Sequence, residues 1–417
     1  TLEDCLRIGI DNNLSLEGKR KEIQKSKYGV SENRSKLLPQ INAIAGYNNN
    51  FDPPVSVTDG SSYGVPYNIT KTLQHSANAG LEMQMPLFNQ TLYTSMSIAK
   101  VMEEISRLSY GKAREDVILQ ISKMYYLGQV TAEQIMLIKA NITRLEELRD
   151  ITQAFFDNGM SMEVDLKRVN INLENLKVQY DNAQAMMKQQ LNMLKYIMDY
   201  PAEKEIALTP VNTDSITTVA LTGLSENIYE LQLSQSQVQL AERQKKIITN
   251  GYIPSLSLTG SWRYAAYTDK GYHWFHSGPS NQWFRSYGVG LTLRIPIFDG
   301  LDKTYKIKKA MIDIENKRLA WEEARQNLQT QYLNAVNDLM NNQRNFKKQK
   351  DNYLLAEDVY AVTSDRYREG IASMTEVLQD EMQMSEAQNN YISAHYNYRV
   401  TNLMLLKLTG QIESLVK

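Results

Sequence analysis

Two kinds of hydrophobic pattern divide the chain. Residues 92–157 and 302–369 contain no proline and few glycines, and their Leu, Ile and Met residues recur at helical spacing among Glu, Lys and Gln. This period predicts long, polar-rich helices there, and the same pattern predicts helices over 162–198, 373–409 and 14–37. At 1.5 Å per residue the two longest would each span roughly 100 Å. Helices of that length form coiled-coil tubes or hairpin arrays and do not pack into a globule.

Four shorter segments alternate between apolar and polar residues: 39–51, 74–88, 253–268 and 283–298. Successive side chains of a strand point to opposite faces, so each segment is predicted to be a β-strand with one apolar and one polar face. The polar face is rich in Ser, Thr, Gly, Asn and Gln, which is typical of outer-membrane barrel strands. Residues expected to face lipid are Leu256, Leu258, Leu291 and Leu293. Two charged residues are expected on the lumen-facing side, Glu82 and Arg263.

The strands could instead form a soluble β-sandwich with aromatic residues in its core. Four strands in two hairpins, one in each half of the chain, would make a poor core. The aromatic residues also gather toward the far end of the second hairpin, where an interfacial girdle would lie. They are Trp262, Tyr264, Tyr267, Trp274, Trp283, Phe284 and Tyr287. The smallest membrane barrels use about eight strands, and lipid does not tolerate open strand edges. Other copies of the chain must therefore complete the barrel. Three copies would supply about 12 strands.

The sequence contains an internal repeat. Leu-Pro-Gln-Ile at 38–41 is matched by Ile-Pro-Ser-Leu at 253–256, Met-Pro-Leu-Phe-Asn at 85–89 by Ile-Pro-Ile-Phe-Asp at 295–299, and Asp-Asn-Gly at 157–159 by Arg-Glu-Gly at 368–370. Near-constant offsets between separated landmarks indicate a duplicated unit. We predict two tandem repeats, 1–210 and 211–417, each running helix, strand, loop, strand, very long helix, turn and helix. The fold class is therefore mainly α with a β-barrel portion.

Charge and composition exclude several kinds of protein. Lys and Arg total 46 and Asp and Glu total 47, a balance that argues against nucleic acid as the main partner. No window holds about 18 consecutive apolar residues, so no transmembrane helix is expected. The single cysteine, Cys5, allows no internal disulfide and is expected to be a buried small hydrophobe. The chain opens at Thr1 without a basic and apolar leader, so an export signal is expected to have been removed or to lie outside this sequence.

No catalytic motif is present. The sequence has no Ser–His–Asp pattern, no Gly-rich phosphate loop and no H-E-x-x-H. His273 and His276 are three residues apart and could suit a metal, but they lie between two predicted strands with no carboxylate beyond Asp269 nearby. A loop tip is the better interpretation. We therefore predict no enzyme activity, no metal site and no cofactor.

The repeated motifs resemble those of the TolC-like outer-membrane efflux family. The resemblance rests on the ordered set of strand entries and exits described above and on the start Thr-Leu-Glu-Asp-Cys-Leu. Its most specific part is Tyr-Arg-Glu-Gly-Ile-Ala-Ser-Met-Thr-Glu-Val-Leu at 367–378, which is similar to the family's tip motif. The first-half partner of this motif lies at 155–165.

The resemblance implies a homotrimer in the outer membrane of a Gram-negative bacterium. One end would be a 12-stranded barrel and the other a helical tunnel that crosses the periplasm and closes at its tip. Such proteins are passive exit ducts of tripartite efflux or type I secretion systems, and they dock onto a periplasmic adaptor protein and an inner-membrane transporter.

By the same resemblance, Asp165, Tyr367 and Glu376 match positions that line the closed periplasmic gate. Gly159 and Gly370 would form the tip turns. Rings of carboxylates around a three-fold axis would attract cations and respond to pH. The alternative is that Asp165 and Glu376 are ordinary acids at helix N-termini. The family places a basic residue where Ala372 stands and a second acid where Gln379 stands, so a double acidic ring is not implied here.

Two other functions fit part of the pattern. A trimeric coiled-coil structural or adhesive protein anchored by a barrel would need only one anchoring unit, whereas each half of this chain has its own predicted hairpin. A soluble periplasmic adaptor would leave the apolar strand faces unexplained. The exit duct accounts for the helices, the strands and the repeat together.

Overall fold

The structure, a computed structural model, describes residues 1–210, 223–269 and 282–416. His273, His276 and Trp274 lie outside the described residues. The chain divides into two compact units, one of Thr1–Ile23, Ile105–Gln235 and Arg318–Lys417 and the other of Gln24–Glu104 and Ser236–Lys317. The first unit is helical and the second carries the strands together with helical segments.

The predicted long helices are confirmed to within about two residues at each end. They are α3 (Gln90–Asp157), α4 (Glu163–Met198), α6 (Asp302–Arg368) and α7 (Met374–Leu408). The shorter helices are α1 (Leu2–Asn12), α2 (Leu14–Ser35), α5 (Tyr229–Asn250) and two 3₁₀ turns, η1 (Ser61–Tyr63) and η2 (Ile412–Val416). Within the described part of the chain, no helix is both long and apolar enough to span a bilayer.

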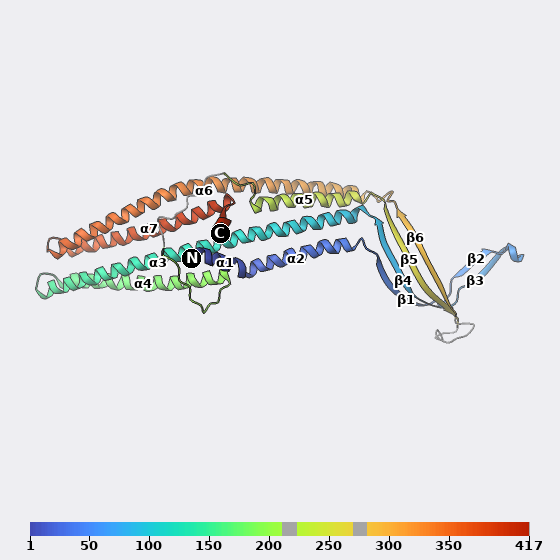
Figure 1. Ribbon diagram of the computed structural model, residues 1–417, viewed down its shortest axis with the longest axis horizontal. Helices are drawn as coiled ribbons and strands as arrows, with labels where there is room; N and C mark the ends of the chain where they lie inside the picture. Colours follow the sequence, from blue (N-terminus) through green and yellow to red (C-terminus); the bar gives the residue numbers. More distant parts are fainter. Residues whose placement is uncertain (211–222, 270–281, 417) are drawn as a thin grey trace. The chain divides into compact units, whose positions relative to one another are not determined.

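Each long helix is followed by a tight turn and an antiparallel partner, α4 after α3 and α7 after α6 (Figure 1). Gly159 and Gly370 form these turns with φ of +71° and +76°. At each turn the glycine N–H and the next N–H bond back to the carbonyls of the preceding helical turn, as in a Schellman motif. Asp199 and Gly410 end α4 and α7 in the same way, with φ of +51° and +70°. The two hairpins therefore have matching turn geometry at both ends of their second helices.

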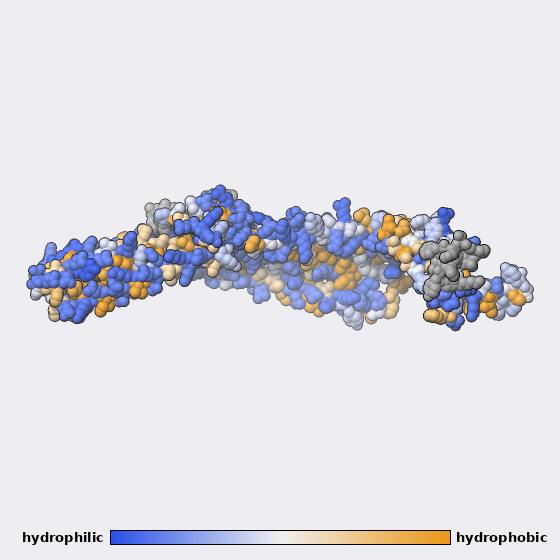
Figure 2. All heavy atoms as spheres, turned by 90° about the horizontal axis from the view of Figure 1, so that it is seen from below, coloured by the Kyte–Doolittle hydropathy of each residue, from blue (hydrophilic) through white to orange (hydrophobic). Residues whose placement is uncertain are grey.

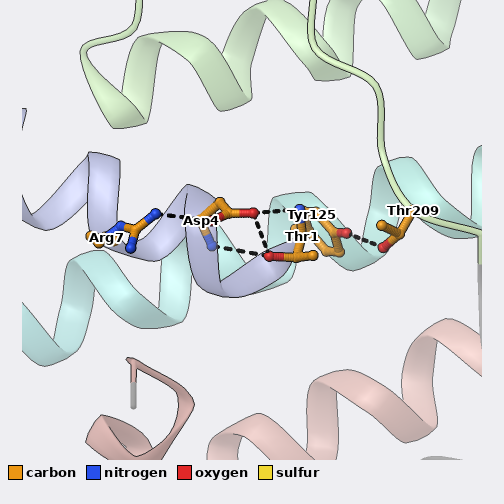
Figure 3. A network of polar contacts seen from close by, with 5 residues as sticks. All are labelled: Thr1, Asp4, Arg7, Tyr125 and Thr209. Carbon is orange, nitrogen blue, oxygen red and sulfur yellow. Dashed lines mark hydrogen bonds and ion pairs between the residues drawn. The ribbon is translucent and has the colours of Figure 1, made fainter.

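Four apolar clusters lie in the helical unit, and two of them position the features discussed below. The first joins α1, α3, α4 and η2 through side chains such as Leu6, Ile118 and Leu194, each almost fully buried. At the edge of this cluster the Tyr125 hydroxyl lies 2.6 Å from Thr209 Oγ1 (Figure 3). Thr1 caps the N-terminus of α1 in a capping box with Asp4, and Asp4 also forms an ion pair with Arg7. The second cluster lies near the two tips and combines residues of α3, α4, α6 and α7.

The four predicted strands form a single antiparallel sheet in the order β1-β4-β5-β6. Their bounds are β1 (Gln40–Asn49), β4 (His75–Phe88), β5 (Ser255–Thr268) and β6 (Trp283–Arg294). The two hairpins are not separate, because β4 pairs with β5 along most of its length. Strands from both halves of the sequence thus share one sheet, and β1 and β6 are its edges.

The register places the apolar residues on one face. Leu81 lies opposite Trp262, which lies opposite Tyr287, and Leu258 lies opposite Leu291. Glu82, Ser261 and Gly288 form the neighbouring row on the other face. The alternation of residues predicted strands with one apolar and one polar face. Strand pairing aligns the apolar faces of all four strands on one side of the sheet.

The structure adds a hairpin that the sequence pattern did not indicate. Between β1 and β4 the chain forms β2 (Val55–Asp59) and β3 (Tyr67–Lys71), which pair only with each other among the described strands. The predicted aromatic group also divides between the faces, because Tyr267 and Phe284 pair with Ser76 and Ala265 on the polar side. A single aromatic girdle on the apolar face therefore has fewer members than expected.

Candidate transport surfaces and tip site

The polar face of the sheet carries the two charged residues predicted there. Glu82 on β4 and Arg263 on β5 form an ion pair, with both side chains slightly less than half exposed. They line a shallow cavity of about 560 Å³ together with Asn42, Gln84, Ser261 and Gly288. The surface is therefore polar and close to neutral, and it suits contact with water better than tight binding of one ligand.

Glycines allow neighbouring strands to approach each other closely on this polar face. A Cβ atom at Gly80 would lie 2.4 Å from the Trp262 carbonyl oxygen and 2.8 Å from Arg263 Cα. At Gly290 it would lie 3.1 Å from Thr259 Oγ1. Such close approach between neighbouring strands is typical of the inner side of a curved sheet, where side chains converge.

The opposite face presents apolar side chains to the surroundings. Leu291 and Leu293 are 66% and 60% exposed on β6, and Val289 is 79% exposed. Leu256 and Leu258 on β5 lie on the same face and are half-buried by their strand neighbours. Water would contact this surface at a cost of about 25 cal/mol per Å², so an apolar environment is favoured.

Asp165 lies in the first turn of α4, where a carboxylate is favourable beside the helix N-terminus. Its carboxylate pairs with Arg168 at 3.2 Å, and Arg168 in turn donates to Thr375 Oγ1 of α7 at 3.3 Å. Asp165 therefore belongs to a polar contact that links the two tips. The sequence analysis missed Arg168, since its partner on α7 is more than 200 residues away.

Tyr367, near the end of α6, is only 6% exposed. Its ring packs against Phe155 with centroids 5.7 Å apart, and its hydroxyl donates to Thr152 Oγ1 at 3.3 Å. Within one chain the residue therefore holds α6 against α3 from the inside of the tip cluster.

Glu376 caps its own helix. Its carboxylate accepts the backbone N–H of Ser373 at 2.8 Å, while the Ser373 hydroxyl accepts the backbone N–H of Glu376, which is a complete capping box. These hydrogen bonds from Ser373 hold the pKa of the Glu376 carboxyl below its ordinary range. A ring of like charges would act in the opposite direction.

The two tip turns meet around one cavity of about 690 Å³. Its lining includes Asp165, Arg168, Tyr367, Gly159, Gly370 and Ala372. Two of the three predicted gate residues thus share a site, and Glu376 lies outside its lining. Ala372 contributes no charge, so Arg168 is the basic residue nearest to Asp165 in the ion pairs of the described chain.

A buried polar seam joins the two halves farther from the tips. Asn141 of α3 donates to Gln388 of α7 at 2.7 Å, and Tyr391 of α7 donates to Glu133 of α3 at 3.0 Å. His395 is fully buried beside them; its Nε2 accepts from Arg399, and its Nδ1 lies 3.4 Å from Glu133. Among the described residues, no group of three or more His, Cys, Asp and Glu side chains could hold a metal ion.

Comparison with known proteins identifies the class. The chain matches the family described as outer membrane efflux protein over residues 8–198 and 220–411. It is 21% identical to the outer membrane protein TolC of Vibrio cholerae over 399 residues, covering 92% of this chain and 84% of that protein. It is 19% identical to TolC of Escherichia coli over 394 residues, covering 92% and 76%.

Solved structures of outer-membrane channels share the fold. The structure of CusC superposes with a TM-score of 0.81 at 16% identity, covering 98% of this chain and 91% of that one. The outer-membrane channel OprN gives a TM-score of 0.79 at 14% identity, covering 98% and 89%. The chain therefore shares with these structures a fold that combines a four-stranded sheet and long helical hairpins. The chain belongs to the outer membrane efflux protein family. It is an outer-membrane protein and an efflux duct, not an enzyme.

Proposed function

We propose that the protein works as a homotrimeric exit duct, open to water inside and passive toward its cargo. The observation that carries this proposal is the two-faced sheet, which is apolar and exposed on one side and polar and glycine-lined on the other. A curved sheet of this kind suits a barrel wall between lipid and an aqueous lumen. In this proposal Glu82 and Arg263 face the lumen, and the four leucines named above face lipid.

The unpaired edges require other copies. β1 and β6 each have one neighbour within the described sheet. An open strand edge cannot lie in the hydrocarbon core of a bilayer, so β1 of one copy pairs with β6 of the next. Three copies make a closed barrel of about 12 strands, within the range of outer-membrane barrels.

The helical hairpins extend from the barrel into the periplasm in this proposal. Their tips, at Gly159 and Gly370, form the mouth that docks onto a periplasmic adaptor protein and, through it, serves an inner-membrane transporter. Each repeat, 1–210 and 211–417, supplies one hairpin and two strands. The mass of the detergent-solubilised protein tests the assembly, because a trimer has about three times the 47.8 kDa chain mass. A monomeric mass would contradict it.

The tip contacts are expected to restrain opening. Asp165→Ala removes the Arg168 partner, and Tyr367→Phe removes one hydrogen bond to Thr152, worth about 1 kcal/mol. We expect the double variant to raise single-channel conductance in planar bilayers. Glu82→Gln, made in the sheet, is the control and should leave tip-limited conductance nearly unchanged. Unaltered conductance in the double variant would place the constriction elsewhere.

The charge of Glu376 has a separate expected effect. If three copies of this carboxylate surround the mouth, Glu376→Gln weakens cation selectivity and block by multivalent cations. Gln retains an acceptor for the Ser373 N–H, so the helix cap is largely kept. Reversal potentials in a salt gradient measure the selectivity. Equal reversal potentials for the variant and the parent protein would show that Glu376 only caps α7.

A further inference from the structure

One charged residue lies on the apolar face of the sheet. The strands β1, β4, β5 and β6 contain the charged side chains of Glu82, Arg263, Arg285 and Arg294. The register places Arg285 opposite Tyr264 on the face that also carries Tyr287, whereas the other three belong to the polar face. The guanidinium carbon of Arg285 lies 5.9 Å from the centre of the Tyr287 ring, so both side chains leave the strand on the same side. A cation on a face without any carboxylate indicates an anionic neighbour from outside the sheet.

The same charge on a helix would carry no such meaning. Hydrophilic residues cover most of the helical surface that is visible in Figure 2. Acidic partners are also at hand there, as for Lys167 with Glu163 at 2.8 Å and Lys306 with Asp302 at 2.7 Å. Arg285 is exposed, and among the described residues no carboxylate forms an ion pair with it.

The adjoining parts of the chain supply no acidic partner for Arg285 either. In the proposed barrel the other neighbour of β6 is β1 of the next copy, and β1 has no Asp or Glu. The segment 270–281, which connects β5 to β6, also has none. Glu82 is already paired with Arg263 on the polar face. The anion that Arg285 meets is therefore expected to come from the surroundings of the sheet.

Arg285 lies toward the end of the sheet that is remote from the helices. The helices α2, α3, α5 and α6 join the strands at the opposite end, marked by Gln40, Phe88, Ser255 and Arg294 (Figure 1). Leu293, near that helical end, is eight residues from Arg285, which is about 26 Å along the strand and roughly 20 Å along the bilayer normal at a tilt of about 40°. The apolar band of an outer-membrane barrel is about 25 Å tall. With the helices in the periplasm, Arg285 thus lies at the level of the outer-leaflet headgroups.

Aromatic side chains surround Arg285 on this face. Tyr264 is directly opposite on β5, and Trp262 meets Tyr264 edge-on, with ring centroids 5.4 Å apart and planes at 76°. Tyr287 is 76% exposed and Trp262 46% exposed, so both can be reached from outside. Tyr and Trp favour the membrane interface because their rings contact acyl chains while the O–H and N–H groups donate to headgroups. A guanidinium beside such rings keeps its planar fork of N–H donors available.

We propose that Arg285, together with Trp262, Tyr264 and Tyr287, binds the anionic phosphate of an outer-leaflet lipid headgroup. This inference rests on the proposed function and adds a lipid class and its site. The guanidinium donates two parallel N–H bonds to phosphate oxygens, a geometry that arginine suits better than lysine. The acyl chains lie along the apolar face below, where Leu291 is exposed. Each chain carries one such site.

Native mass spectrometry of the full protein in a neutral detergent tests the site. The probes are phosphatidic acid, whose headgroup is a bare phosphate, and phosphatidylcholine, whose phosphate is neutralised by its own ammonium group. We expect one phosphatidic acid per chain to be retained, with about tenfold higher affinity than phosphatidylcholine. Arg285→Gln should abolish this preference. Arg285→Lys should keep part of it, because the charge remains without the bidentate geometry.

Arg294→Gln is the matched control, because it removes the same charge from the polar face of the same strand. This variant should retain the preference for phosphatidic acid. Equal binding of the two lipids by the parent protein, or an unchanged preference in Arg285→Gln, would overturn the site. Displacement of the bound lipid by millimolar inorganic phosphate would show a site for a soluble anion and would overturn the lipid headgroup as its occupant.

The same spectra separate this inference from the proposed duct. The site lies within one chain, so the number of lipids per chain can be read from any oligomer. A trimer mass with no preference for phosphatidic acid would overturn the lipid site and leave the duct standing. A monomeric mass would overturn the proposed trimer, and the comparison of Arg285→Gln with Arg294→Gln would still decide the lipid site.

Discussion

Leu291→Arg is expected to prevent assembly of the barrel in membranes. Leu291 lies on β6 opposite Leu258, on the apolar face, and is 66% exposed in the single chain. A lipid-facing Arg near mid-bilayer costs about 2–4 kcal/mol, and a trimer carries it three times. The measurement is the yield of heat-resistant trimer folded into lipid vesicles, which should fall strongly.

Thr292→Arg is the matched control one residue away. Thr292 pairs with Ser257 on the polar face, so its side chain would extend into water in the proposed lumen. Folding yield should then stay close to that of the parent protein, with conductance changed by the added charge. Equal losses at both positions would contradict the assignment of the two faces, and equal tolerance would mean that the sheet does not contact lipid.

The sequence pattern predicts the long elements well because each carries its own signal. The helices extend over dozens of residues with one period, and Gly159 and Gly370 mark their ends. Alternation assigns side chains to faces within one strand. The pairing of β4 with β5, however, joins residues about 180 positions apart, and no local pattern specifies which strands become neighbours.

The short hairpin β2–β3 shows where local signals fail. Its strands have five residues each; β2 follows Pro53 and Pro54 and β3 follows Pro66, and these prolines favour a loop interpretation. Its alternation is nonetheless present, since Val57 pairs with Ile69 on one side while Thr58 pairs with Asn68 on the other. A strand signal this short does not outweigh the prolines around it.

The tip residues were predicted from the resemblance to the family, but the contacts that they make could not be predicted from the sequence. Tyr367 lies in the most specific motif, yet its burial depends on Thr152 and Phe155, which are distant in the sequence. The Glu133–Tyr391 hydrogen bond spans 258 positions. A single sequence shows which side chains are polar, but it does not show which of them become partners. The gate role of Asp165, Tyr367 and Glu376 stays a prediction.

The second large effect is expected at Glu115, a carboxyl group on α3 that is only 4% exposed. Burial, with further repulsion from Glu413 and Asp116, raises its pKa to about 7 despite the nearby Lys407 and Arg114. Those four groups are themselves paired, Arg114 with Glu413 at 2.7 Å and Lys407 with Asp116 at 2.5 Å. Among the described residues, therefore, no basic side chain forms an ion pair with Glu115.

The sign of the pH dependence follows from proton binding. Between the ordinary glutamate pKa of 4.5 and about 7, the folded protein holds a proton on Glu115 that the unfolded chain has released. The free energy of unfolding therefore falls as pH rises through this window and becomes level above it. At about 1.4 kcal/mol per pKa unit, the loss is about 3 kcal/mol for each chain.

Glu115→Gln should remove this loss, because the amide is neutral at every pH and has nearly the same shape. We expect the variant to match the parent protein near pH 4, below both pKa values, and to be more stable by about 3 kcal/mol near pH 8. Denaturant unfolding of the helical region, followed by circular dichroism at several pH values, measures the difference. Glu104→Gln, the same change at an exposed position on α3, is the control and should give a pH profile parallel to that of the parent. A parallel profile for Glu115→Gln as well would mean that Glu115 is ionised in the folded protein, with water or another group stabilising its charge.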